Sequence, residues 1–222
     1  LSSTDCRFGL NELALQHIKE ALEGLPEQDR YGSLIWDEIH IKKKLHFDSR
    51  KFEFDGLTDF GDETEEIDVA PGLADHVLVF MFRPYKQSWV QTIACYATRG
   101  ATPGHIISNL VTKITTVLFN HSAIVRNTVC DGAGPNRTAM TMLIGKKAVK
   151  EGRTYFNHPM SDQIKVFCMS DVPHLMKTTR NQFLKYGKVQ FTDSVADFNY
   201  YELMYNVEKK EQLKMVPHLT HA

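Results

Sequence analysis

The spacing of apolar residues along the chain predicts four helices. In residues 10–23, 102–119 and 173–184, apolar side chains recur every three or four positions, as they do on the buried side of a helix. A fourth helix is expected to follow the turn at 132–135 and to end near residue 149. Pro103 and Pro135 suit the first turns of their helices, where a missing N–H costs no hydrogen bond.

Shorter runs rich in β-branched and aromatic residues predict strands between these helices. Residues 31–41, 123–130 and 163–169 are compact apolar runs, and 76–82 is continuously apolar, which is typical of a strand buried on both faces. Residues 51–60 alternate in part and predict a further strand, with a bulge expected at Gly56. Residues 92–98 either continue the strand at 76–82 or pair with it.

The order of these elements indicates the fold class. A helix precedes three consecutive strands, after which helices and strands alternate. This order is typical of the RNase H-like α/β fold, in which helices flank a mixed sheet. We therefore predict a five-stranded mixed sheet. Residues 1–28 form a helical lead-in, 29–187 the RNase H-like domain, and 188–222, where the apolar pattern weakens, the start of an incomplete further domain.

Composition adds few constraints. The chain has 222 residues, 42% of them hydrophobic, which is enough for one domain and part of a second. It lacks an initial Met, a signal peptide and any apolar run of roughly 18 residues, so we expect a piece of a longer protein that does not cross a membrane. The four cysteines are far apart and predict neither a zinc site nor a disulfide framework.

The distribution of charge is more informative than the net charge of -1, which argues against a stand-alone nucleic-acid-binding protein. Residues 59–75 contain seven acids and no bases, as in a solvated loop. Residues 137–188 contain ten bases and three acids, a balance that is compatible with contact to a phosphate backbone.

Two aspartates lie in unusual sequence contexts. Asp37 interrupts an apolar strand, where a carboxylate requires a cation or a partner base. Asp131 ends a strand before a glycine-containing turn, where α/β sheets place their ligands. The alternatives are that Asp37 bonds to a neighbouring backbone group and that Asp131 caps a helix. If their strands are neighbours, both acids belong to one site for divalent cations.

Residues 170–181 carry a third cluster of polar side chains. Asp171 and Pro173 suit the beginning of a helix, and Lys177 and Arg180 share one face of it, from which they can contact phosphates. A capped amphipathic helix explains the same pattern without any ligand.

Three motifs, in this order, resemble the RNase H-like domain of P element transposases and their THAP-associated relatives. They are Trp36-Asp37-Glu38-Ile39-x-Ile41-Lys42, Cys130-Asp131-Gly132-x-Gly134-x-Asn136-Arg137 and Asp171-Val172-Pro173-His174-Leu175-Met176-Lys177-Thr178-Thr179-Arg180-Asn181. The resemblance extends over about residues 10–222, and the last motif is its most specific part.

The resemblance implies a DNA-cutting and strand-joining domain. Its first two catalytic acids, which also bind the metal, fall on Asp37 and Asp131, and Arg137, Lys177 and Arg180 are expected to contact nucleic acid. Mg²⁺ or Mn²⁺ is the implied cofactor, and the partners are DNA transposon ends and other copies of the protein in the nucleus. Residues 188–222 resemble the start of an inserted GTP-binding domain, so any GTP site belongs to the full-length protein.

Two parts of the family pattern are missing from this sequence, and they leave alternatives open. They are the N-terminal zinc finger and the third acid, a Glu that follows the insertion. We therefore expect the isolated chain to have little activity. The alternatives to a transposase fragment are a domesticated or relic DNA-binding protein without catalysis, and an RNase H-type nuclease.

Overall fold

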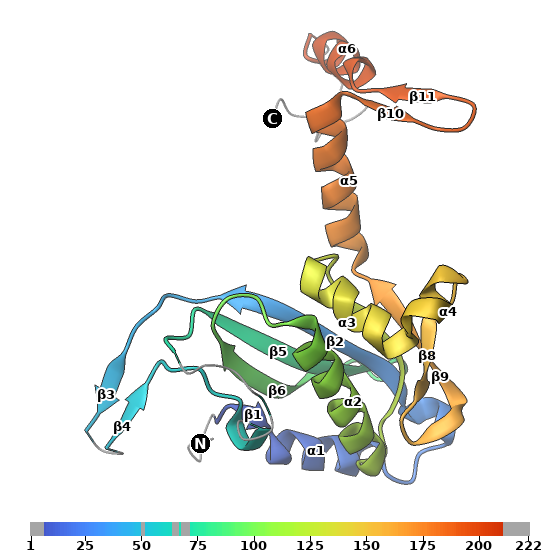
Figure 1. Cartoon of the computed structure of the whole chain (residues 1–222). Helices are drawn as coiled ribbons and strands as arrows, with labels where there is room; N and C mark the ends of the chain where they lie inside the picture. Colours follow the sequence, from blue (N-terminus) through green and yellow to red (C-terminus); the bar gives the residue numbers. More distant parts are fainter. Residues whose placement is uncertain (1–6, 50–51, 64–66, 68–71, 211–222) are drawn as a thin grey trace. The chain divides into compact units, whose positions relative to one another are not determined.

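A seven-stranded mixed sheet forms the centre of residues 1–171, the first of two compact units in the computed structural model (Figure 1). The structure describes residues 7–49, 52–63, 67 and 72–210. The strands lie in the order β1 (Gly9–Leu10), β6 (Gln91–Thr98), β5 (His76–Pro84), β2 (Tyr31–His40), β7 (Ile124–Cys130), β9 (Ser161–Ser170) and β8 (Tyr155–His158).

The strand directions show how the sheet is assembled. β2 pairs antiparallel with β5, which pairs antiparallel with β6, so the first half of the sheet is a meander. On its other side β2 pairs parallel with β7, and β7 pairs parallel with β9. β2 is therefore the strand at which the antiparallel and parallel halves meet.

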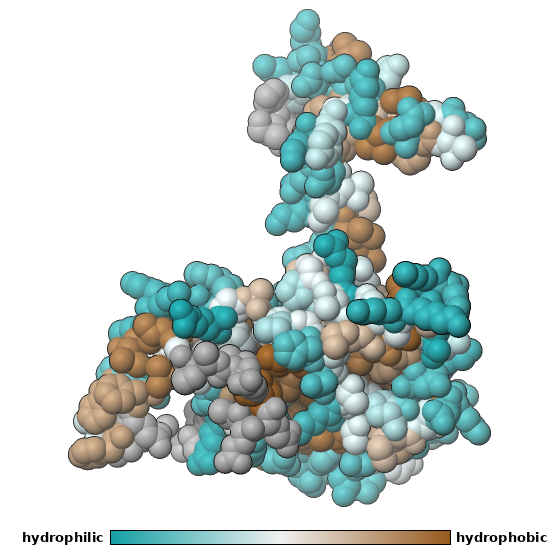
Figure 2. Space-filling model, viewed as in Figure 1, coloured by the Kyte–Doolittle hydropathy of each residue, from teal (hydrophilic) through white to brown (hydrophobic). Residues whose placement is uncertain are grey.

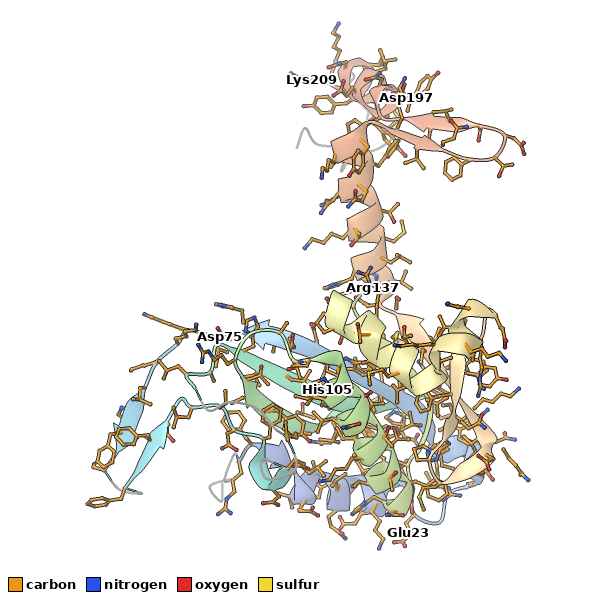
Figure 3. The ribbon with its side chains drawn as sticks, in the orientation of Figure 1. Glu23, Asp75, His105, Arg137, Asp197 and Lys209 are labelled. Atoms are coloured by element: carbon orange, nitrogen blue, oxygen red, sulfur yellow. The ribbon has the colours of Figure 1, made fainter. Side chains whose placement is uncertain are left out.

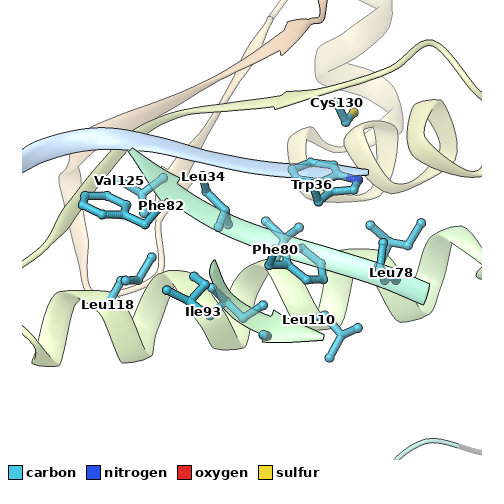
Figure 4. Packing of buried hydrophobic residues seen from close by; sticks show 14 of the residues in the cluster. Leu34, Trp36, Leu78, Phe80, Phe82, Ile93, Leu110, Leu118, Val125 and Cys130 are labelled. Carbon is cyan, nitrogen blue, oxygen red and sulfur yellow. The ribbon is translucent and has the colours of Figure 1, made fainter. Parts of the chain in front are cut away.

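The main core lies between one face of the sheet and the helices α1 (Glu12–Leu22) and α2 (Gly104–Asn120). Because side chains alternate along a strand, Leu34 and Trp36 of β2 point to the same side as Leu78, Phe80 and Phe82 of β5 (Figure 4). All five are at most 1% exposed. Asn11 begins α1 by accepting a hydrogen bond from the backbone N–H of Ala14 at 3.0 Å.

The prediction of an RNase H-like mixed sheet flanked by helices is confirmed, but the sheet has seven strands rather than five. The two strands at its edges, β1 and β8, have only 2 and 4 residues, too few for alternation to reveal them. Residues 92–98 pair with the preceding strand, which decides between the two alternatives.

The strand expected at 51–60 is shorter than predicted and lies outside the main sheet. The chain there forms a separate hairpin of β3 (His46–Asp48) and β4 (Glu53–Asp55), whose exposed Phe47, Phe52 and Phe54 give the brown area over these strands in Figure 2. Gly56 ends β4 with φ of +104°, and a Cβ atom there would lie 1.9 Å from the carbonyl oxygen of Lys44. The chain turns sharply at this glycine and cannot continue as a strand.

The helix expected after residue 132 is interrupted. α3 (Gly134–Ile144) ends at Gly145, whose φ of +94° is outside the helical region, and α4 (Lys146–Lys150) follows. Two short 3₁₀ helices, η1 (Glu27–Arg30) and η2 (Gly61–Glu63), complete the first unit.

The second unit, residues 172–222, has its own small aromatic cluster. It contains α5 (Val172–Tyr186), β10 (Lys188–Gln190), β11 (Val195–Asp197) and α6 (Asn199–Glu208), and Phe183 packs on Phe198 and Tyr201. Residues 211–222, the end of the expected insertion, lie outside the described residues. The division into a lead-in, a catalytic domain and an insertion stays a prediction.

A candidate carboxylate site for metal-dependent chemistry

Asp37 lies on β2, and Asp131 directly follows β7, the parallel strand beside β2. The parallel register pairs Ile35 of β2 with Val129 of β7. If this register is extended by two residues in each strand direction, Asp37 comes level with Asp131. The two aspartates differ in their surroundings: Asp37 is exposed, whereas Asp131 is half-buried.

The side chains of Asp37 and Glu38 point to opposite faces of the sheet, because side chains alternate along a strand. Asp37 lies on the face of the sheet opposite the fully buried Trp36. Its register partner on the antiparallel strand β5 is Val79. Glu38 is on the Trp36 side, where its Oε1 accepts a hydrogen bond from the N–H of Thr102 at 2.7 Å. Glu38 therefore holds the loop before α2 and is not part of a chelating pair with Asp37.

Asp131 is fixed in place by the turn into α3. Its Oδ1 accepts hydrogen bonds from the Ala133 N–H at 2.9 Å and from the Asn136 side-chain amide at 2.7 Å. Asn136 in turn accepts a hydrogen bond from the indole N–H of Trp36 at 2.9 Å, across 100 residues of sequence. Within the described part of the chain Oδ2 of Asp131 has no hydrogen-bond partner. The turn role and a ligand role are thus compatible, since each uses a different oxygen.

The backbone interaction expected for Asp37 is also present. Its Oδ1 accepts from the N–H of Glu38 at 2.9 Å, and among the described residues its Oδ2 accepts no hydrogen bond. Each aspartate therefore keeps one carboxylate oxygen available for a ligand.

The thiol of Cys130 lies within the electrostatic reach of both carboxylates. Burial raises the pKa of Cys130 to about 12, and the negative charges of Asp131, Cys168 and Asp37 contribute to the increase. Cys130 is 2% exposed on the core side beside Trp36 (Figure 4). Both aspartates therefore act on one buried group, and the thiol stays protonated at neutral pH.

Asp171 follows β9, the next parallel strand. Its backbone N–H donates to the carbonyl oxygen of Cys130 at 2.8 Å, so it too lies at this edge of the sheet. Even so, no group of three His, Cys, Asp or Glu residues suited to a metal ion occurs in the described ranges. Two carboxylate oxygens are ligands that Mg²⁺ and Mn²⁺ accept, and they fit part of such a site.

The expected nucleic-acid contacts belong to different units. Arg137 is exposed on α3, six residues after Asp131 in sequence (Figure 3). Lys177 and Arg180 are exposed on α5 of the second unit, where the Arg180 guanidinium donates to Oδ1 of Asn181. The contacts of all three with DNA stay predictions.

Sequence reasoning assigned no role to Asn136 or Trp36. Asn136 is 7% exposed although it lies in the first turn of α3, and it connects a core indole to a candidate ligand. The available signal was its fixed place in the motif, five residues after Asp131. The hydrogen bond to Trp36 could not be predicted from the spacing of nearby residues, because the two residues are 100 positions apart in sequence.

A large mixed sheet flanked by helices, with one aspartate on β2 and another directly after β7, defines the chain as a domain of the RNase H-like class. Residues 6–144 match the family described as TNP-like, RNase H N-terminal domain, and the chain belongs to this family. The resemblance to P element transposases is confirmed by the relatives that follow.

The chain is similar to two transposases and to one solved structure. It is 26% identical to the Transposable element P transposase of Drosophila melanogaster, over 84% of this chain and 21% of that protein. It is 21% identical to the human DNA transposase THAP9, over 93% of this chain and 23% of that protein. The structure of the Drosophila P element transposase strand transfer complex aligns with a TM-score of 0.74 at 21% identity, over 97% of this chain and 42% of that one. The chain therefore spans less than a quarter of these two relatives.

Proposed function

We propose that this chain is the first part of the catalytic domain of a P element-like DNA transposase, which cleaves DNA and joins strands in a metal-dependent reaction in the nucleus. The observation that carries the proposal is the position of Asp37 on β2 and of Asp131 directly after β7, the parallel strand that pairs with β2. The family relationship and the fold shared with the Drosophila P element transposase strand transfer complex support it.

In this proposal the two carboxylates bind divalent cations through their available oxygens. Asp37 and Asp131 would hold Mg²⁺ or Mn²⁺, which when bound supplies Lewis acidity for in-line phosphoryl transfer. A water oxygen or a 3′-hydroxyl forms the new bond to phosphorus while the bond to the leaving 3′ oxygen breaks. Asp131 is the more rigid ligand, since the turn and Asn136 hold its other oxygen.

Binding of Mn²⁺, followed by electron paramagnetic resonance, tests the site without any need for turnover. We expect Asp37→Asn and Asp131→Asn each to remove most of the binding, because each deletes a charged oxygen ligand. Asp162→Asn is the matched control, since Asp162 is an exposed acid at the start of β9. Equal Mn²⁺ affinity in the wild type and in both ligand variants would contradict the assignment of Asp37 and Asp131 as metal ligands.

Cleavage assays test the second part of the proposal. We expect little Mg²⁺-dependent cleavage of DNA by the 222-residue chain, because two carboxylates hold a pair of cations poorly. A longer form of the protein that includes the third acid is expected to cleave DNA and to transfer strands. Efficient cleavage by the short chain that Asp37→Ala abolishes would contradict the expected need for a third acid.

A further inference from the structure

The hydrogen bonds around α3 form one continuous connection from the core to the candidate metal site. The indole N–H of Trp36 donates to Oδ1 of Asn136 at 2.9 Å, and the Nδ2 of Asn136 donates to Oδ1 of Asp131 at 2.7 Å. Trp36 is 1% exposed and Asn136 is 7% exposed. Water therefore competes little for the bond between Trp36 and Asn136.

The donors and acceptors leave Asn136 a single orientation. An indole N–H can only donate, so it must meet the carbonyl oxygen of the Asn136 amide. The amide nitrogen of Asn136 must then face Asp131, where it can only donate. Trp36 thus selects the amide orientation that presents an N–H to the carboxylate, and the reversed orientation would lose both bonds.

The connection begins on β2, beside Asp37, and ends at Asp131, the residue that follows β7. Trp36 immediately precedes Asp37 on β2, and Asn136 holds Asp131 after β7. The ring of Trp36 is itself fixed by packing against Phe80, with 5.9 Å between ring centroids. A side chain of the β2 strand therefore sets the position of the carboxylate that follows β7.

We propose that Asn136 is a positioning residue for the metal site, oriented by Trp36, and that it holds Asp131 so that one oxygen remains directed to the cation. This inference rests on the proposed function. It goes further by assigning roles to two residues that contact neither the cation nor the DNA. Partners of this kind, behind a metal ligand, typically change metal affinity by roughly 10–100-fold when they are removed.

Asn136→Leu tests the inference because it keeps the approximate side-chain volume and removes both bonds. We expect its Mn²⁺ affinity to fall by roughly 10-fold or more. Its thermal stability should also fall, since the Trp36 N–H is then buried without an acceptor. Trp36→Phe should lower the Mn²⁺ affinity less, because Asn136 can still donate to Asp131.

The double variant Trp36→Phe/Asn136→Leu separates positioning from stability. It removes the buried donor and its acceptor together, so stability should recover relative to Asn136→Leu alone. The Mn²⁺ affinity should stay low, because Asp131 still lacks its donor. If affinity recovers together with stability, Asn136 acts only through the fold and the inference is wrong.

Asn127→Leu is the matched control. Asn127 is also a buried asparagine, at 8% exposed, but it accepts a hydrogen bond from Ser33 at 2.7 Å and does not contact the aspartates. Its loss should lower stability and leave Mn²⁺ affinity unchanged. If Asp131→Asn reduces Mn²⁺ binding and Asn136→Leu does not, the positioning role of Asn136 is wrong, while the proposed function stands. If neither variant changes it, the proposed function and this inference fail together.

Discussion

At the scale of single residues, His158 shows how burial of a titratable group makes stability depend on pH. The side chain is 2% exposed, its Nδ1 accepts from the Met160 N–H at 3.1 Å, and within the described chain its Nε2 has no hydrogen-bond partner. Burial lowers its pKa to about 4, and the positive charge of Arg126 contributes in the same direction. The folded protein therefore holds this imidazole in its neutral form.

This arrangement predicts a loss of stability in mild acid. The unfolded chain takes up the proton near pH 6.5, whereas the folded chain resists it down to about pH 4. The contribution of His158 is thus complete above pH 6.5 and decreases as the pH falls through this window, by about 2 kcal/mol between pH 7 and pH 5. Urea unfolding at both pH values measures the change.

His158→Gln provides the comparison for that measurement. Glutamine cannot be protonated, so the free energy of unfolding of the variant should change less between pH 7 and pH 5 than that of the wild type. The same pH dependence in both proteins would show that other groups cause it.

Single residues also show where reading the sequence succeeds. Asp37 and Asp131 stand out because a carboxylate in or directly after an apolar strand is costly, and this cost is visible in the local sequence. Asn136 does not stand out, since a polar residue in the first turn of a helix is ordinary. Its importance depends on Trp36, which only the folded chain brings near.

At the scale of elements, α2 and α3 approach closely at Gly104. A Cβ atom at this position would lie 2.7 Å from the carbonyl oxygen of Pro135 and 2.7 Å from the Cβ of Thr138. The absence of a side chain at the start of α2 thus allows the first turn of α3 to pack against it. That turn carries Asn136.

Gly104→Ala should therefore destabilise the protein by about 1–3 kcal/mol, because backbone and a helical side chain must move. The change in the midpoint of chemical unfolding measures this effect. Gly132→Ala is the control, since a Cβ atom there meets nothing within 4 Å. Equal stability of the two variants would mean that the helices adjust without cost.

The predicted elements were accurate where periodicity extends over a whole turn or strand, as in α2 and β5. At 51–60 only a three-residue strand forms, and it belongs to an exposed hairpin rather than to the main sheet. Alternation reveals a strand but not the sheet to which it belongs. The short β1 and β8 were missed because edge pairing needs partners that the local sequence does not contain.

At the scale of the whole molecule, charge is divided between distant parts of the sequence. The acids of residues 59–75 contrast with the bases that follow Asp131. Arg137 and Lys146 line a groove of about 420 Å³ along α3, and in the part of the chain that the structure describes neither forms an ion pair. Such uncompensated cations suit contact with the phosphates of a DNA backbone. None of the described helices is long and apolar enough to cross a membrane.

Removal of both cations should weaken DNA binding in a salt-dependent way. For Arg137→Gln/Lys146→Gln we expect the slope of log affinity against log salt concentration to decrease by roughly 1 for each phosphate that the protein no longer neutralises. Fluorescence anisotropy with duplex DNA in Ca²⁺ measures it. The double variant Arg83→Gln/Lys86→Gln is the control. It removes the same number of charges at the C-terminal end of β5, away from the groove, and should leave the slope unchanged. Equal slopes for the two double variants would exclude this groove as a DNA-binding surface.

The parallel pairing of β2 with β7 has a consequence for folding. Residues joined across these strands, such as Ser33 and Asn127, are 94 positions apart in sequence. We therefore expect this pairing to form slowly, after the local pairing of the meander and the formation of α2. The two aspartates therefore come together late, and partly folded chains contain neither the register nor the Trp36–Asn136 bond. During refolding, recovery of Mn²⁺ binding would mark the completion of the sheet rather than its beginning.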